Sequence, residues 1–128
     1  MVLFIIYFLK KNLYRKTKYP CYGKTINVKG IRIFYTDNQK IEKPVLLFLH
    51  GFQSFHYVFS KNISFFDKDY RIITLDLPGF GYSEKPLNFN YTFQNVCEFI
   101  HEFLKKLNIS KINFIGNSLG GGIAIAYS

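Results

Sequence analysis

The whole sequence has no tryptophan, one methionine and two cysteines. None of its first 36 residues is acidic. Two cysteines, Cys21 and Cys97, are too few for a disulfide framework, and we expect both to be free thiols. No residue pair has the spacing of metal ligands. The glycine run 120–122 fits neither a dinucleotide-binding loop nor a P-loop, which favours close helix packing. We therefore expect no cofactor and no metal.

Positive charge is concentrated at the N-terminus. The chain carries 17 Lys and Arg against 8 Asp and Glu, a net charge of +9. Residues 1–36 hold eight of the basic residues, whereas residues 37–128 hold nine basic and eight acidic ones. The basicity therefore belongs to an N-terminal arm. Because there is no base-reading module and the rest of the chain is nearly neutral, nucleic acid is not an expected partner.

The arm, residues 1–23, begins with an apolar run from Val2 to Leu9 that is followed at once by Lys10 and Lys11. A bilayer span needs about 20 apolar residues, so this run is too short to cross a membrane. It also lacks the charge pattern and cleavage site of a signal peptide. Three interpretations stay open: a helix on an anionic membrane surface through residues 1–20, the remnant of a longer anchor, or a plain tail. The compartment is not indicated.

Residues 24–128 show the pattern of an α/β domain. Alternating residues from Thr25 to Tyr35 predict an antiparallel hairpin with its turn at Lys29-Gly30. Unbroken apolar runs then predict strands buried on both faces, and periodic segments between them predict helices. Strands are expected at 45–49, 71–75 and 112–115, and helices at 57–66, 92–107 and 119–127. Strands alternating with helices indicate a mainly parallel sheet with flanking helices.

Ser118 lies where the strand at 112–115 turns into the helix at 119–127, with Gly116 and Gly120 two residues to either side. Glycines at these positions permit a sharp bend that leaves the serine hydroxyl projecting. This pattern resembles the nucleophile elbow, G-x-S-x-G, of the α/β-hydrolase family. A His-Gly pair at 50–51 and the run Asp76-Leu-Pro-Gly-Phe-Gly81 follow the two earlier strands, so the resemblance extends over residues 24–128.

The resemblance implies a serine hydrolase of ester-like bonds that forms an acyl-enzyme on Ser118. The backbone N–H groups of Phe52 and Leu119 would then form the oxyanion hole. The resemblance also makes His50 a structural residue that braces its loop, because the catalytic histidine of the family comes last in the chain. We expect Asp76 to brace the turn that follows it, and His56 and His101 to be surface or loop residues.

The resemblance covers only the N-terminal part of such a domain. The later strands, the cap region and the acid and histidine of the triad have no counterpart here, so we expect the 128-residue chain alone to be inactive and the edge beside residues 112–115 to be open. A serine rather than an aspartate at position 118 argues against the epoxide-hydrolase and dehalogenase branches. The alternative is a non-catalytic, membrane-associated binding protein that retains half of the hydrolase fold.

Overall fold

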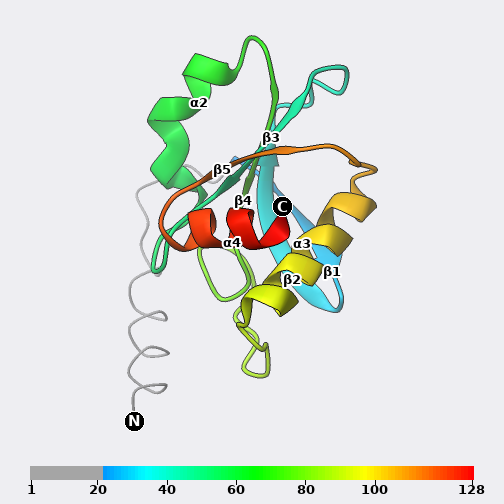
Figure 1. The fold of residues 1–128 in the computed structure, drawn as a ribbon, viewed down its shortest axis with the longest axis vertical. Coiled ribbons are helices and arrows are strands. Elements are labelled where there is room, and N and C mark those ends of the chain that lie inside the picture. The colour runs from blue at the N-terminus through cyan, green and yellow to red at the C-terminus, as the bar shows by residue number, and fades with distance from the viewer. Residues whose placement is uncertain (1–21) are drawn as a thin grey trace.

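The computed structural model describes residues 22–128, which form one five-stranded sheet with helices on both faces (Figure 1). The strand order is β1-β2-β4-β3-β5. The expectations for residues 1–21, including Cys21 and nearly all of the basic arm, lie outside the described residues. The predicted fold class, a hairpin that leads into a mainly parallel sheet, is confirmed.

The chain enters the sheet through the predicted hairpin. Strand β1 (Lys24–Val28) pairs antiparallel with β2 (Ile31–Asp37). The two turn residues, Lys29 and Gly30, both have positive φ values, 50° and 83°. Such a turn matches the right-handed twist of the strands. The Asn27 side chain accepts a hydrogen bond of 3.0 Å from the N–H of Gly30, which fixes the turn.

The parallel part of the sheet is built from three strands. Strands β3 (Val45–Leu49) and β4 (Arg71–Leu75) run parallel and are buried at every position, as their unbroken apolar runs predict. Strand β5 (Asn113–Gly116) pairs with β3 in parallel, but none of its residues is fully buried. The expectation of a buried third strand is therefore wrong: in the described sheet, β5 has a neighbour on one side only.

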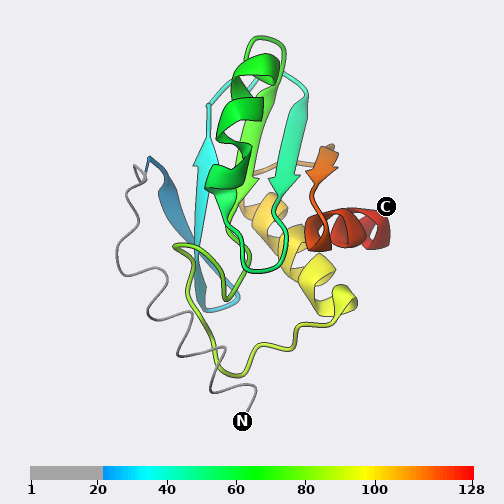
Figure 2. The same cartoon turned by 90° about the vertical axis from the view of Figure 1, so that its left-hand side faces the viewer.

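Helices cover both faces of this sheet (Figure 2). On one face, the predicted helix at 57–66 is a 3₁₀ turn, η1 (His56–Phe59), that continues as α2 (Ser60–Phe66). On the other face lie α3 (Phe93–Lys106) and α4 (Leu119–Tyr127), close to their predicted bounds. The side chain of Thr92 caps α3 by accepting a hydrogen bond from the N–H of Asn95, at 3.3 Å.

Two apolar clusters fill the space between these layers. Leu47 and Leu49 of β3 belong to the cluster on the α3 and α4 side, whereas Leu46 and Phe48 belong to the cluster beneath η1 and α2. The Phe48 ring meets Phe59 of η1 edge-on, with centroids 5.0 Å apart. Alternate residues of β3 thus pack against the helices on opposite faces of the sheet. This packing on both sides fixes the position of the carboxyl end of β3.

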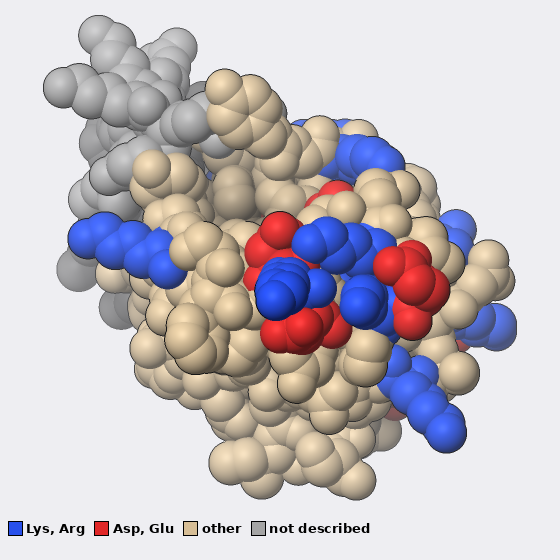
Figure 3. Space-filling model, turned by 90° about the horizontal axis from the view of Figure 1, so that it is seen from above, with Lys and Arg blue, Asp and Glu red and all other residues tan. Residues whose placement is uncertain are grey.

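Acidic and basic side chains are interspersed at the end of the molecule shown in Figure 3. One ion pair joins Lys40 to Asp67 at 3.0 Å. A second, between Arg71 and Asp37 at 2.7 Å, is almost completely buried and links β4 to β2. Positive and negative charges are therefore mixed on this face, and neither sign dominates it. No helix within residues 22–128 is long and apolar enough to cross a membrane.

Candidate active site

The carboxyl ends of the three parallel strands meet at one edge of the sheet. Leu49 of β3 is opposite Leu75 of β4 and Gly116 of β5 in the strand register. The residues that follow these positions are therefore neighbours: His50 after β3, Asp76 after β4 and Ser118 after β5. This is the expected arrangement, because ligand sites of open parallel sheets form beyond the carboxyl ends of the strands. We refer to this edge as the rim.

Ser118 has φ 50° and ψ −112°, an unusual backbone conformation for a residue with a side chain. It is exposed and directly precedes α4. The N–H of Asn117 donates to the carbonyl oxygen of Leu49 at 3.0 Å, and the N–H of Gly120 donates to Asn117 at 2.9 Å. These bonds hold the sharp turn against β3, so that Ser118 is presented at its tip.

The two glycines around Ser118 are required by close packing. A Cβ atom on Gly116 would lie 2.5 Å from backbone atoms of Gly120, and a Cβ atom on Gly120 would overlap the carbonyl oxygen of Leu49. Neither position can hold a side chain while α4 stays against β3. The predicted reason for these glycines, a bend too tight for Cβ atoms, is therefore confirmed.

The loop after β3 approaches the turn that carries Ser118. A Cβ atom on Gly51 would lie 2.9 Å from the Asn117 side chain and 3.3 Å from the Cβ of Ser118. Gly51 thus brings the following residue, Phe52, to the side of the serine. Among the hydrogen bonds within residues 22–128, none has the N–H of Phe52 or of Leu119 as its donor. Neither N–H group therefore has an acceptor within the described part of the chain.

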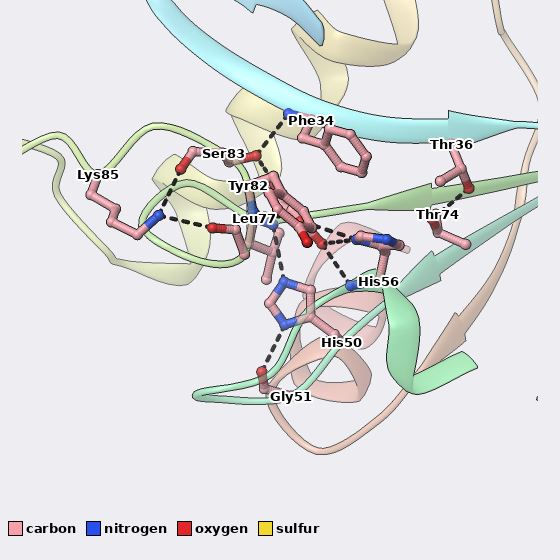
Figure 4. A network of polar contacts seen from close by, with 12 residues as sticks. Phe34, Thr36, His50, Gly51, His56, Thr74, Leu77, Tyr82, Ser83 and Lys85 are labelled. Carbon is pink, nitrogen blue, oxygen red and sulfur yellow. Dashed lines mark hydrogen bonds and ion pairs between the residues drawn. The ribbon is translucent and has the colours of Figure 1, made fainter. Parts of the chain in front are cut away.

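His50 is buried and bonded through both ring nitrogens (Figure 4). Its Nδ1 lies 2.7 Å from the carbonyl oxygen of Gly51, and its Nε2 accepts a hydrogen bond of 3.1 Å from the N–H of Leu77. These partners assign the ring proton to Nδ1. Burial lowers the pKa of His50 below its ordinary value of 6.5, which favours this neutral form. His50 therefore braces its loop, in agreement with the resemblance.

His56 is buried against Asp76 at the start of η1, so its expected place at the surface or in a loop is wrong. Oδ1 of Asp76 accepts the backbone N–H of His56 at 2.6 Å, and Nδ1 of the ring lies 3.0 Å from Oδ1 and 3.1 Å from Oδ2. The Asp76 carboxylate is fully buried and needs such donors. His101, by contrast, is exposed on α3, as expected, with Nδ1 3.3 Å from the hydroxyl of Tyr127.

Asp76 braces the turn after β4, as expected. Its Oδ2 accepts the N–H of Tyr82 at 2.8 Å. The hydroxyl of Ser83 donates to the carbonyl oxygen of Asp76 at 2.6 Å and accepts the N–H of Phe34 at 2.8 Å, which ties the same turn to β2. Sequence reasoning missed Ser83 and the His56 contact. Their only signal was that both residues are polar and lie close to the glycine-containing loops.

The rim holds an exposed serine, the N–H groups of Phe52 and Leu119 and a network of buried hydrogen bonds. Its described residues include no cluster of metal-binding side chains. Within residues 22–128, no group of three or more His, Cys, Asp and Glu side chains could hold a metal ion. Cys97 is a free thiol, as expected. His50 has both ring nitrogens bonded to neighbouring groups, and His56 is bonded to Asp76 through Nδ1. Within residues 22–128, no hydrogen bond joins either ring to Ser118.

Residues 44–128 match the family model described as the alpha/beta hydrolase fold. The chain belongs to this family. The α/β-hydrolase fold accounts for the sheet order, for the glycine-flanked serine and for the His-Gly loop. The predicted family membership is therefore confirmed.

Two curated relatives show how much of an α/β hydrolase is represented. The uncharacterized hydrolase YugF of Bacillus subtilis is 35% identical over 103 residues, which are 80% of this chain and 38% of YugF. Human epoxide hydrolase 4 is 35% identical over 105 residues, covering 81% of this chain and 29% of the relative. The chain thus spans well under half the length of these relatives, as the resemblance led us to expect.

A solved α/β-hydrolase structure extends the comparison to nearly the whole chain. The crystal structure of a membrane phospholipase A, described as a bacterial virulence factor, is similar with a TM-score of 0.79 and 26% sequence identity. The similarity covers 98% of this chain and 39% of that protein.

Proposed function

We propose that the protein is a serine hydrolase of ester-like bonds and that Ser118 is its nucleophile. The observation that carries this proposal is the backbone of Ser118, held at φ 50° on an exposed turn between β5 and α4. Strained backbone of this kind is found where a side chain must be presented to a ligand. A serine at the surface of an ordinary helix start needs no such conformation.

The proposed reaction begins when Oγ of Ser118 attacks the carbonyl carbon of the substrate. The C=O π electrons move to the oxygen, and the N–H groups of Phe52 and Leu119 stabilise the negative charge that forms there. When the tetrahedral intermediate collapses, the leaving alkoxide takes up a proton and departs as an alcohol, leaving an acyl group on Ser118. Attack by water on this ester then releases the acid and restores the hydroxyl.

A general base must accept the proton of Ser118, and the described histidines do not provide it. His50 uses both ring nitrogens, and within residues 22–128 no hydrogen bond joins His56, which is bonded to Asp76 through Nδ1, to Ser118. We therefore propose that the base and the acid that orients it lie outside these 128 residues. Without them, the serine hydroxyl is a weak nucleophile. The 128-residue chain alone should react slowly with acylating reagents.

The choice of ester-like substrates rests on the chemistry of residue 118. Relatives of the chain include a protein named epoxide hydrolase 4, and a similar structure is a phospholipase. The resemblance assigns a carboxylate nucleophile to epoxide hydrolases, whereas this chain has a hydroxyl at that position. A hydroxyl activated by a base favours acyl transfer, so we propose carboxylic esters or related bonds as substrates.

A fluorophosphonate probe tests the proposal, because it reacts with activated serines. The protein expressed from its own gene should be labelled on the peptide that contains Ser118, and Ser118→Ala should abolish the label. The matched control is Ser110→Ala, which removes an exposed hydroxyl near β5 and should leave labelling unchanged. An unlabelled protein would contradict the proposal and favour the non-catalytic alternative. Rapid labelling of the isolated 128-residue chain would contradict the proposal that the general base lies outside these residues.

We also propose that residues 1–23 form an arm that associates with a membrane surface, while residues 24–128 form the hydrolase part. The support is the apolar run Val2 to Leu9 beside Lys10 and Lys11, and the similarity of nearly the whole chain to a membrane phospholipase. A peptide of residues 1–20 should float with anionic liposomes at low salt and be released by high salt. Replacing both lysines by Glu should abolish flotation. Flotation unchanged by this replacement would contradict the proposed attraction of the lysines to anionic lipid.

A further inference from the structure

We infer that His56 is a positioning residue: through Asp76, its imidazole holds the loop 50–56 in the place where the N–H of Phe52 can stabilise an oxyanion. This inference rests on the proposed function, because it concerns the same reaction at Ser118. His56 itself does not touch the reacting atoms. It acts on the loop, which is fixed at two ends by two different histidines.

The loop connects the end of β3 to the start of η1. At its first end, His50 bonds both Gly51 and Leu77, as described above. Inside the loop, the N–H of Ser54 donates to the carbonyl oxygen of Gly51 at 3.2 Å. Phe52 lies between these residues, and its ring contacts that of Phe80 with centroids 5.8 Å apart. The position of its N–H therefore depends on where the two ends of the loop are held.

The first end of the loop continues from β3, whereas His56 bonds the second end to the residue that follows β4. The backbone N–H and the ring Nδ1 of His56 both bond to the Asp76 carboxylate, at 2.6 Å and 3.0 Å. Asp76 directly follows β4, so this contact joins the loop to the neighbouring strand of the sheet. Because an ionised carboxylate only accepts hydrogen bonds, the proton must be on Nδ1.

The imidazole is also held by aromatic rings that fix its orientation. The ring centroid of His56 lies 4.9 Å from Phe34, 5.3 Å from Phe55 and 5.8 Å from Tyr82. Figure 4 shows the ring pointing into this network from the start of η1. With the ring fixed and the carboxylate fully buried, loss of the Nδ1 donor would leave Asp76 short of one partner. The remaining donors to the carboxylate are the backbone N–H groups of His56 and Tyr82.

Two substitutions separate the hydrogen bond from the volume of the side chain. His56→Asn keeps an N–H donor at the position of Nδ1, whereas His56→Leu fills similar space without a donor. The variants are made in the protein expressed from its own gene, and His101→Leu, on the exposed side of α3, is the control. We measure both the rate and the final extent of fluorophosphonate labelling, together with amide hydrogen exchange of the peptide that contains Phe52.

We expect His56→Leu to slow labelling by about tenfold or more, since loss of a whole oxyanion donor lowers rates about 10²- to 10³-fold. The final extent should remain complete, and exchange at the loop should become faster. His56→Asn should stay within about threefold of the unsubstituted protein in both measurements. A variant that is merely unstable would instead lower the final extent of labelling.

Three results would overturn the inference: an unchanged rate in His56→Leu, an equally slow rate in both variants, or a reduced final extent with a normal rate. If the unsubstituted protein is never labelled, the proposed function fails, and the exchange measurement still decides whether His56 holds the loop. Unchanged exchange in His56→Leu would then reject the positioning role as well.

Discussion

Gly120 is the residue whose substitution should damage the candidate site most directly. Its Cα hydrogen faces the carbonyl oxygen of Leu49, and a methyl group there would overlap this backbone atom. Backbone cannot turn away as a side chain can, so Gly120→Ala should lower the free energy of unfolding by about 3 kcal/mol or prevent folding. Urea denaturation followed by circular dichroism measures the change.

Gly121 supplies the matched control, one position later in the same helix. A Cβ atom on Gly121 would meet its nearest neighbour, the carbonyl oxygen of Gly116, at an ordinary 3.5 Å. Gly121→Ala should therefore raise the free energy of unfolding by about 0.5–1 kcal/mol through helix propensity. Equal effects of the two substitutions would show that α4 does not pack on β3 as described.

The protonation of His50 should make the stability of the fold depend on pH. Burial lowers its pKa below 6.5, so below that pH the unfolded chain binds a proton that the folded chain does not. The stability from this residue is fully present above pH 6.5 and is lost as the pH falls toward the lowered pKa. The slope from one such proton is at most about 1.4 kcal/mol per pH unit.

Urea denaturation between pH 5 and pH 7.5 tests this expectation for the unsubstituted chain and for His50→Gln. The variant should be less stable at neutral pH, and its stability should fall less steeply below pH 6.5. His101→Gln serves as the control, because that histidine is exposed on α3. The same pH slope in His50→Gln would assign the dependence to other groups.

His50 and His56 show which parts of the site could be predicted from sequence. The role of His50 was implied by the resemblance to the α/β-hydrolase family, and the motif that carries the resemblance there, a His-Gly pair after a buried strand, is local. The role of His56 depends on Asp76, twenty residues later, whose carboxylate reaches it only because β3 and β4 are neighbours. Sequence periodicity carries no information about such a contact, so the sequence predicts a surface or loop position for His56.

Strands β2 and β4 are joined by a buried ion pair in addition to their backbone hydrogen bonds. Nε and Nη2 of Arg71 donate to the two oxygens of Asp37 at 3.1 Å and 2.7 Å. The Arg71 and Asp37 side chains are 9% and 1% exposed. Asp37→Ala should therefore lower the free energy of unfolding by about 3–5 kcal/mol, because it leaves a buried charge without its partner.

The control for this pair is on α3, where Glu102 lies 4.0 Å from Lys105 at the surface. Glu102→Ala should change the free energy of unfolding by less than about 0.5 kcal/mol. The double variant Asp37→Leu, Arg71→Leu should recover much of the stability lost in Asp37→Ala, since neither charge is then buried. No recovery would place the importance of Asp37 elsewhere, for example in its bond to the N–H of Gln39.

Most helix and strand bounds could be predicted because the patterns that define them are local. The apolar runs of β3 and β4 and the periodic stripe of α3 lie within single segments of the sequence. Burial of β5 could not be predicted in the same way. It depends on what lies beyond its outer side, which no pattern within the strand describes.

The outer side of β5 should control self-association of the 128-residue chain. In the described sheet, this strand offers backbone hydrogen-bonding groups that face away from β3, and its residues Asn113 to Gly116 carry no charge. Such edges pair with other strands. The isolated chain should therefore form oligomers whose size grows with concentration, as measured by light scattering after size exclusion.

A charge at this edge should reduce the association. Asn113→Lys adds a lysine to an exposed position of β5, whereas Asn62→Lys adds the same charge to an exposed position of α2. Only the first variant should shift the chain toward the monomer, since a charged edge strand resists pairing. An equal shift in both variants would show that net charge, and not the edge, governs association.

The described part of the chain has the α/β-hydrolase fold, and the chain spans well under half the length of the relatives it matches. Its described sheet carries the turn with Ser118, the loop with Phe52 and the bracing network, and the matched relatives are about three times as long as the aligned part. In the proposed reaction, the base and the acid are not among the described residues, and the rim would supply the serine and the groups that bind the oxyanion.

The positive φ of Ser118 means that any side chain at this position costs folding stability. Replacement of Ser118 by Ala or by Gly removes the hydroxyl equally, but only Gly adopts φ 50° without steric conflict. Ser118→Gly should thus be more stable than Ser118→Ala by about 1 kcal/mol. A glycine at this position would relieve that steric conflict, so the serine side chain is held there at a cost in folding stability.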